Sequence, residues 1–194
     1  MNIQSEELVG KAKSLFNEMV LSFGSDPYHL RTHLQEAQKW AYYMTKKYPE
    51  ADKEVILLAV WLHDIGHYPV PTNIDHSIRS EKIAKEFLKE ESYSEDKMEK
   101  VLHCVRAHRC RDVQPETLEA KIIAFLDAAS HMTDTMYLSM AKQAKEKGSD
   151  FDVCAKMERD FRELSLFPEI KEDLVELYGS WKNLIKVYEK IEFK

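Results

Sequence analysis

Glycine, proline and cysteine are all scarce in this chain of 194 residues, and each scarcity excludes a class of structure. The 5 glycines and 6 prolines leave little material for the many tight turns of a protein built from short strands, so long helices are favoured. The 3 cysteines are odd in number and lack the spacing of a metal-binding pair, which indicates reduced thiols and no disulfide framework. We therefore expect a helical protein that is stabilised by a buried core.

A long apolar run and a block of like charge are also absent. No stretch approaches the roughly 20 apolar residues of a membrane-spanning helix. The first residues do not follow a basic segment with an apolar one, so we expect no signal peptide. The net charge is −6, and nothing in its distribution indicates a basic face for nucleic-acid polymers. These absences predict a cytoplasmic protein that binds neither a membrane nor a nucleic acid.

Hydrophobic residues make up 44% of the chain and charged residues 32%, which is the balance of a globular protein with one well-buried core. Apolar positions recur at spacings of three and four, as in amphipathic helices. No repeat, low-complexity segment or linker divides the chain, so we expect residues 1–194 to form a single all-α domain. The predicted helices cover residues 5–22, 27–47, 53–64, 76–90, 95–109, 115–147, 151–164 and 168–191.

Several residues are expected to set the ends of these helices. Asp26, Asp52 and Asp75 precede predicted helices and are good N-caps, because a carboxylate accepts hydrogen bonds from the first backbone N–H groups. Pro27 would then occupy the first helical position after Asp26. Gly66 follows the apolar helix 53–64, and we expect it to end that helix in the left-handed conformation that glycine tolerates.

The chain is organised around residues 60–68, in which His63 and Asp64 stand side by side at the end of an apolar run. Burying an ionised carboxylate is costly unless it is paired or binds a metal. Imidazole and carboxylate together suit a divalent cation. The competing interpretation is a helix C-terminus whose histidine compensates the helix dipole. His67 would lie one turn beyond His63, close to whatever the pair holds.

Two further residues match this chemistry. His33 lies on a stripe with small alanines in the helix 27–47, and Asp127 follows an apolar run in a predicted core helix. For His33 alone, a hydrogen-bonded core imidazole explains the position at least as well. Asp127 is harder to explain as a solvated surface group. Together with His63 and Asp64 they form a ligand set for a divalent metal with open positions.

This ordered set resembles the HD superfamily of metal-dependent phosphohydrolases, which are α-helical bundles defined by a His, then a His-Asp pair, then a distant Asp. The resemblance covers roughly residues 25–135, and residues 136–194 lie outside it. His29 is an alternative first ligand, but His33 fits the first motif better. The matching segments are Arg31-Thr32-His33 with Glu36 and Ala37, His63-Asp64-Ile65-Gly66, and Phe125-Leu126-Asp127-Ala128.

The resemblance implies a metal centre with one or two divalent ions per chain, drawn from Mn, Mg, Fe, Co, Ni and Zn. His33, His63, Asp64 and Asp127 would hold the first ion. His76 and His108 are placed like the histidines that hold a second ion in two-metal relatives.

The implied reaction is hydrolysis of a small-molecule phosphate ester, plausibly a nucleotide, by a metal-activated water. Asp64 and His67 are the expected catalytic residues, because His67 lies where relatives carry a group that orients water or donates a proton. The loop 68–74, stiffened by two prolines, would form one wall of the substrate site. Arginine suits phosphate, and for each candidate arginine a surface ion pair is the competing interpretation. The candidates are Arg79, Arg106 and Arg109.

Two other functions remain open at this stage. Some HD-fold proteins are diiron oxygenases, and bound iron with a requirement for oxygen would favour that function. Others are non-catalytic modules that bind a nucleotide signal without turnover. The sequence leaves the oligomeric state open, and a homo-oligomer is compatible with it. His103 is interpreted as structural, and the charges of the last two helices as ordinary helix surface.

Overall fold

The computed structural model describes residues 3–68 and 73–191, which form helices and turns with no strand among them. The expected all-α fold is therefore confirmed. Single turns of 3-10 helix lie at η1 (Ile65–His67), η2 (Leu164–Leu166) and η3 (Glu172–Leu174). The α-helices are α1 (Ile3–Phe23), α2 (Leu30–Lys47), α3 (Lys53–Leu62), α4 (His76–Glu90), α5 (Glu95–Ala107), α6 (Leu118–Thr133), α7 (Met136–Lys147), α8 (Val153–Glu163), α9 (Pro168–Lys171) and α10 (Val175–Glu189).

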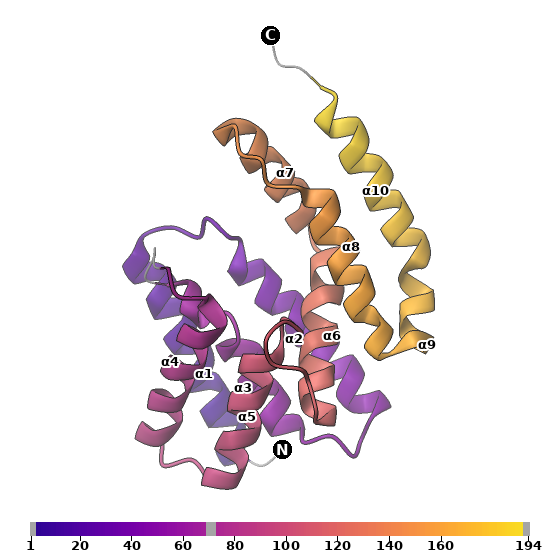
Figure 1. Cartoon of the computed structure of the whole chain (residues 1–194). Helices are drawn as coiled ribbons and strands as arrows, with labels where there is room; N and C mark the ends of the chain where they lie inside the picture. Colours follow the sequence, from indigo (N-terminus) through magenta and orange to yellow (C-terminus); the bar gives the residue numbers. More distant parts are fainter. Residues whose placement is uncertain (1–2, 69–72, 192–194) are drawn as a thin grey trace.

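The helices form two groups that share α6. Helices α1 to α5 gather at the N-terminal end, while α7, α8 and α10 stand together and project away from them (Figure 1). Helix α6 packs against α2, α3 and α5 on one side and against α8 on the other. It is thus the element that connects the N-terminal helices to the C-terminal ones.

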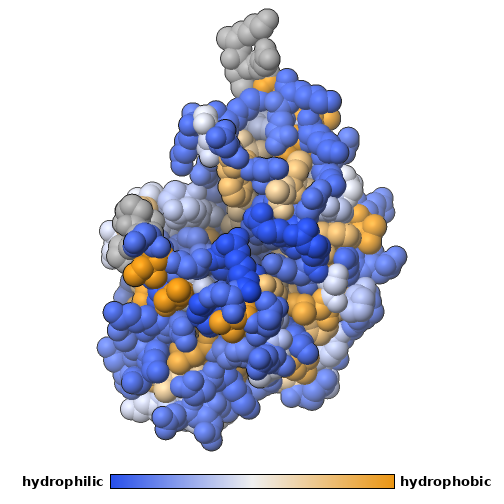
Figure 2. All heavy atoms as spheres, in the orientation of Figure 1, coloured by the Kyte–Doolittle hydropathy of each residue, from blue (hydrophilic) through white to orange (hydrophobic). Residues whose placement is uncertain are grey.

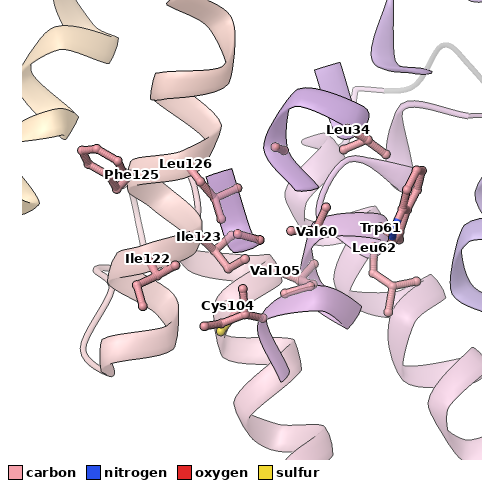
Figure 3. Packing of buried hydrophobic residues seen from close by; sticks show 14 of the residues in the cluster. Leu34, Val60, Trp61, Leu62, Cys104, Val105, Ile122, Ile123, Phe125 and Leu126 are labelled. Carbon is pink, nitrogen blue, oxygen red and sulfur yellow. The ribbon is translucent and has the colours of Figure 1, made fainter. Parts of the chain in front are cut away.

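The core lies around α3 and α6. Every residue of α3 from 55 to 62 is buried, and α6 is buried continuously from residue 122 to 132. A helix that is apolar all round has to be enclosed by its neighbours. Figure 3 shows the side chains of Val60 and Trp61 on one side of this core and those of Ile123 and Leu126 on the other.

The start of α2 differs from the expectation. The helix begins at Leu30, so Pro27 lies before it, and His29 adopts a left-handed conformation with φ of 55°. Asp26 still accepts hydrogen bonds, but from the N–H groups of Leu30 at 2.9 Å and Arg31 at 3.0 Å. The Asp26 carboxylate reaches the free N–H groups at the start of α2 across an intervening turn. The sequence rule for N-caps considers only the residue directly before a helix and therefore does not predict this contact.

Gly66 serves a different purpose from the one expected. Among the described residues the glycines with positive φ are Gly24 and Gly148, so the left-handed ending at Gly66 is wrong. A Cβ atom on Gly66 would instead lie 2.3 Å from the carbonyl oxygen of His76 and 2.5 Å from the backbone nitrogen of Ser80. Its own N–H donates to Ser80 Oγ at 2.9 Å. Glycine is required here because α4 packs directly on the turn after the His-Asp pair.

The expected long helix 115–147 is divided in two. Thr117 caps α6, and Asp134 leaves the helical conformation with φ of −105° and ψ of −178° before α7 begins. Its carboxylate accepts a hydrogen bond from Thr135 N at 2.6 Å. This bend allows the chain to turn back so that α8 lies against α6.

The other predicted caps agree with the structure. Asp52 accepts from the N–H groups of Glu54 and Val55 at the start of α3, and Asp75 accepts from Ser77 N at the start of α4. None of the described helices combines the length and the apolar character needed to cross a membrane. The cytoplasmic location stays a prediction.

Candidate metal centre

Four buried residues converge at the centre of the N-terminal helices. His33 comes from α2, His63 and Asp64 follow α3 directly, and Asp127 comes from α6. One donor atom of each lies within 4.8 Å of the others. His33 Nε2 lies 3.0 Å from Asp127 Oδ1 and 3.6 Å from Asp64 Oδ2. His63 Nε2 lies 3.5 Å and 3.7 Å from the same two oxygens.

The two imidazoles are held with Nε2 facing this cluster. The Nδ1 atom of His63 is 3.0 Å from the carbonyl oxygen of Val60, which can only accept, so a neutral His63 carries its hydrogen on Nδ1. His33 Nδ1 is 3.0 Å from Ser130 Oγ, whose own hydrogen goes to the carbonyl of Asp127. Anchoring one ring nitrogen in this way is how proteins orient metal-binding histidines.

A second group shares Asp64 with the first. Asp64 Oδ1 lies 3.3 Å from His76 Nε2 and 3.5 Å from His108 Nε2, and these two nitrogens are 3.3 Å apart. His108 Nδ1 donates to the carbonyl of Val105 at 2.7 Å. Because Oδ2 of Asp64 faces the first group and Oδ1 faces the second, one carboxylate stands between two ligand-type clusters.

The cluster favours positive charge at its centre. Burial opposes ionisation of Asp64, but the charge of His63 and a hydrogen bond from His76 outweigh it and hold the pKa well below its usual range. Burial likewise opposes protonation of His63, yet Asp64 and Asp127 raise its pKa to about 9. The cluster offers two imidazoles and two carboxylates, and its electrostatics favour a positive charge between them. This donor set fits a divalent cation.

His67 lies beside both groups without belonging to either. It sits on η1 with Nε2 at 3.7 Å from Asp64 Oδ1, and its ring stacks on His76 at 4.0 Å between centroids. The ring of Tyr28 covers it at 4.8 Å. Burial lowers the pKa of His67 to about 4, against the opposing effect of Asp64, so the imidazole is neutral at neutral pH.

A cavity of about 270 Å³ opens above these residues. Asp64 and Asp127 lie at its base, and His67, His76, His108 and His131 also line it. Further lining comes from the turn before α2, the loop after α5, and helices α7 and α8. In Figure 2 strongly hydrophilic side chains gather across the hollowed middle of the face between the C-terminal helices and the rest of the molecule.

The predicted phosphate-binding arginines divide into two kinds. Arg109 lines the cavity, where its guanidinium pairs with Asp75. Arg106 pairs with Asp112 and donates to Ser77 Oγ at 2.9 Å, which favours the ion-pair interpretation, and it is not among the described residues that line the cavity. Arg79 is half-buried and is likewise not among those lining residues.

The structure also separates the other candidates. His29 is exposed and belongs to neither metal-type group, whereas His33 is fully buried within the first. His103 accepts a hydrogen bond from Glu116 N at 3.1 Å, in agreement with a structural role. Residues 69–72 of the expected substrate loop lie outside the described residues.

His131 was missed by the sequence interpretation. It follows Asp127 by one helical turn, a spacing that could have revealed it. Its ring stacks on His33 at 4.6 Å with an angle of 13°. Its Nε2 is 3.8 Å from Asp127 Oδ1, and its Nδ1 is 3.2 Å from Asp160 Oδ2.

Four of the charged residues of α8 are not ordinary helix surface. Asp160 is only 2% exposed and binds Lys156 Nζ at 2.5 Å and the Tyr137 hydroxyl at 2.7 Å. Lys156, Arg159, Asp160 and Glu163 all line the cavity. The available signal was that Asp160 falls on the apolar stripe of its helix, where a carboxylate needs partners.

Comparison with known proteins agrees with this arrangement. The family model for the HD domain matches residues 30–132, which is just over half of the chain. The match begins with α2, ends within α6 and contains all four residues of the first cluster, while α7 to α10 lie beyond it. No curated protein and no solved structure matches the chain. The chain therefore belongs to the HD domain family, whose members are largely metal-dependent hydrolases.

Proposed function

We propose that this protein is a metal-dependent phosphohydrolase that acts on a small, nucleotide-like phosphate ester. The observation that carries the proposal is the convergence of His33, His63, Asp64 and Asp127, two of which, Asp64 and Asp127, line a cavity that also has cationic side chains in its lining. Ligand-type residues buried without such a purpose would only cost stability.

The first ion would be held by these four residues, and a second by Asp64, His76 and His108. When bound, the cation supplies a Lewis acid that lowers the pKa of water and neutralises charge on the phosphoryl oxygens. Imidazole nitrogens in both groups favour Fe, Co, Ni or Zn over Mg and Mn, which suit oxygen ligands better.

His67 is the residue of this chain that we assign to proton transfer. Its neutral imidazole lines the cavity and has Nε2 facing Asp64, so it can accept a proton there and return it. Stacking against His76 and Tyr28 holds the ring in place. A positioned neutral imidazole needs no charge change before it acts as a base.

The apolar side of the cavity supports an ester with an organic part. Tyr28, Met136, Met140 and Phe151 line it, and they suit the flat face of a base or a similar group. The volume of about 270 Å³ suits a small molecule rather than a polymer. This is the basis for proposing a nucleotide-like substrate.

The test is metal analysis of purified protein, followed by phosphate release from a panel of nucleotides and sugar phosphates with each candidate metal supplied. Asp64→Ala is expected to lose bound metal and activity together. His67→Ala is expected to keep its metal while turnover falls by roughly 10²–10⁴-fold, the usual contribution of a general acid–base. His103→Gln, outside the cavity, is the matched control and should behave like the wild type. An unchanged rate in His67→Ala, with chemistry rate-limiting, would refute its role.

The shared position of Asp64 also supports a diiron oxygenase as a second candidate, because one carboxylate stands between two histidine-containing groups. Iron-loaded protein that consumes oxygen and releases no phosphate would favour that function. Nucleotide binding without turnover by any metal-loaded form would instead favour a signal-binding module.

A further inference from the structure

We propose that the cavity contains a second anion subsite, formed by Arg111 and Arg159, and that the substrate places a second phosphate group there. This inference rests on the proposed function, which assigns the phosphate to be hydrolysed to the metal centre. It narrows the substrate class to esters that carry at least two phosphates.

The two arginines come from different elements that line the cavity. Arg111 lies in the loop after α5, and Arg159 lies on α8, which is outside the span matched by the HD family. Both line the cavity. In Figure 1 the loop after α5 and helix α8 both lie next to α6, and the strongly hydrophilic band of Figure 2 lies in the same region.

Unlike the other cations of the cavity, these two have no partner among the described residues. Arg109 pairs with Asp75, and Lys156 is bonded to Asp160. Neither the Arg111 nor the Arg159 guanidinium makes a hydrogen bond or ion pair with any residue in the part of the chain that the structure describes. Arg159 is nevertheless half-buried, so its charge is partly withdrawn from water.

The cations are close enough to repel one another. Burial lowers the pKa of Arg111, and the charges of Arg109 and Arg159 lower it further. Asp75 and Glu163 oppose this effect, but burial with the nearby Asp127 and Asp160 raises the pKa of Glu163 to about 8. The raised pKa of Glu163 weakens the compensation that its carboxylate offers the arginines. An anion bound between them would remove the repulsion.

The arginines form an outer layer relative to the metal centre. Arg111 is exposed and Arg159 is half-buried, whereas Asp64 and Asp127 are buried. The pair is thus placed to hold a group adjacent to the reacting phosphate rather than that phosphate itself.

The chemistry of the pair selects phosphate. Each guanidinium offers a planar fork of N–H donors that matches two phosphate oxygens, and two of them together balance a phosphate dianion. A diphosphate or a bisphosphate bound by both layers would place one phosphate on the metal centre and the other between Arg111 and Arg159.

The experiment compares two probes that cannot be hydrolysed at phosphorus–oxygen ester bonds, methylphosphonate and methylenediphosphonate, by calorimetric titration. Wild-type protein is expected to prefer the diphosphonate. Arg111→Gln and Arg159→Gln should each weaken diphosphonate binding by roughly ten- to hundredfold, the usual effect of losing a charged hydrogen bond, and leave methylphosphonate unchanged. Arg162→Gln, exposed on the same helix as Arg159, is the control and should keep the preference. Titrations with and without metal, and melting curves for each variant, separate metal chelation and misfolding from loss of the subsite.

The outcomes discriminate between the two proposals. Equal weakening of both probes would mean that the arginines hold the phosphate at the metal centre, and no weakening would mean that they hold none; either result overturns the subsite. Because the readout is binding, a protein that releases no phosphate from any ester but keeps the arginine-dependent preference would refute the proposed function and leave the subsite standing.

Discussion

At the scale of single residues, the centre depends on how its histidines are anchored. His63 and His108 each cap the C-terminal end of a helix, and each bonds through Nδ1 to the carbonyl three residues earlier. In both cases the acceptor is a backbone carbonyl that the end of the helix leaves free. The bond to Nδ1 orients each ring so that its Nε2 atom faces Asp64. The glycine that follows the His-Asp pair serves the same centre by allowing α4, which begins with His76, to approach.

Gly66→Ala is expected to destabilise the fold and to displace His76. The added Cβ would overlap the backbone of His76 and Ser80, which cannot move as a side-chain end can. Overpacking of this kind costs roughly 1–3 kcal/mol, measurable as a lower urea midpoint.

Gly10→Ala is the control for this change. Gly10 lies in α1 with nothing within 4 Å of the added Cβ, so alanine should stabilise the helix by about 0.5–1 kcal/mol. Equal stability of the two variants would contradict the close packing at Gly66.

At the scale of elements, α8 is the helix that completes the cavity. Asp160 takes the buried position between Met157 and Leu164 and binds residues from two other helices. Its oxygens contact Tyr137 on α7 and His131 on α6, so one carboxylate ties three helices together. The docking of α8 therefore positions the cavity wall that carries Lys156 and Arg159.

Asp160→Asn is expected to cost about 1–3 kcal/mol of stability, because it leaves Lys156 and the Tyr137 hydroxyl without the charged acceptor they now have. Glu158→Gln on the same helix is the control, since its exposed pair with Lys182 at 3.1 Å should contribute less than about 1 kcal/mol. Chemical denaturation of both variants measures the loss in free energy of unfolding. If Asp160→Asn lost no more stability than Glu158→Gln, Asp160 would not hold the three helices together.

The same carboxylate predicts a pH dependence. Burial opposes its ionisation, but Lys156 and His131 outweigh burial and lower the pKa of Asp160 to about 2. The folded-state pKa is thus below the unfolded value of about 3.9. Its contribution is complete above about pH 5 and is lost progressively as the pH falls towards about 2. The stability gap between wild type and Asp160→Asn should close over that window.

At the scale of the whole molecule, the metal centre joins elements that are distant in sequence. Its first group draws on α2, the end of α3, and α6, and its second adds α4 and the end of α5. A cation bound there would connect helices α2 to α6 and would bind the folded chain more tightly than the unfolded one.

Metal should therefore raise the melting temperature. At a free metal concentration of 100 Kd the stabilisation is about 2.7 kcal/mol, which corresponds to roughly 5–10 °C for a chain of this size. The shift is expected to disappear in Asp64→Ala and to persist in Asp96→Ala, whose carboxylate is exposed on α5. A wild-type protein whose melting temperature does not respond to any of the candidate metals would contradict the centre.

The resemblance to the HD superfamily indicated His76 and His108, and the sequence by itself determined the helical class, most helix limits and the residues of the first cluster. These follow from local rules, because apolar spacing reports burial and a carboxylate in an apolar run needs a partner wherever it lies. The order of His33, the His63-Asp64 pair and Asp127 along the chain was therefore enough to indicate a metal centre. Local rules also indicated the caps at Asp52 and Asp75.

Only the tertiary structure decided what surrounds the centre. The break at Asp134 separates two segments that both favour helix. The apolar periodicity of the sequence continues across the break and therefore predicted one helix. The bend at Asp134 is nevertheless what brings α8 against α6. Pairing across the fold then decided that Arg106 is held by Asp112, that Arg109 faces the cavity and that Asp160 supports His131. Such contacts depend on the angles at which helices pack, and those angles are set by side chains far apart in the chain.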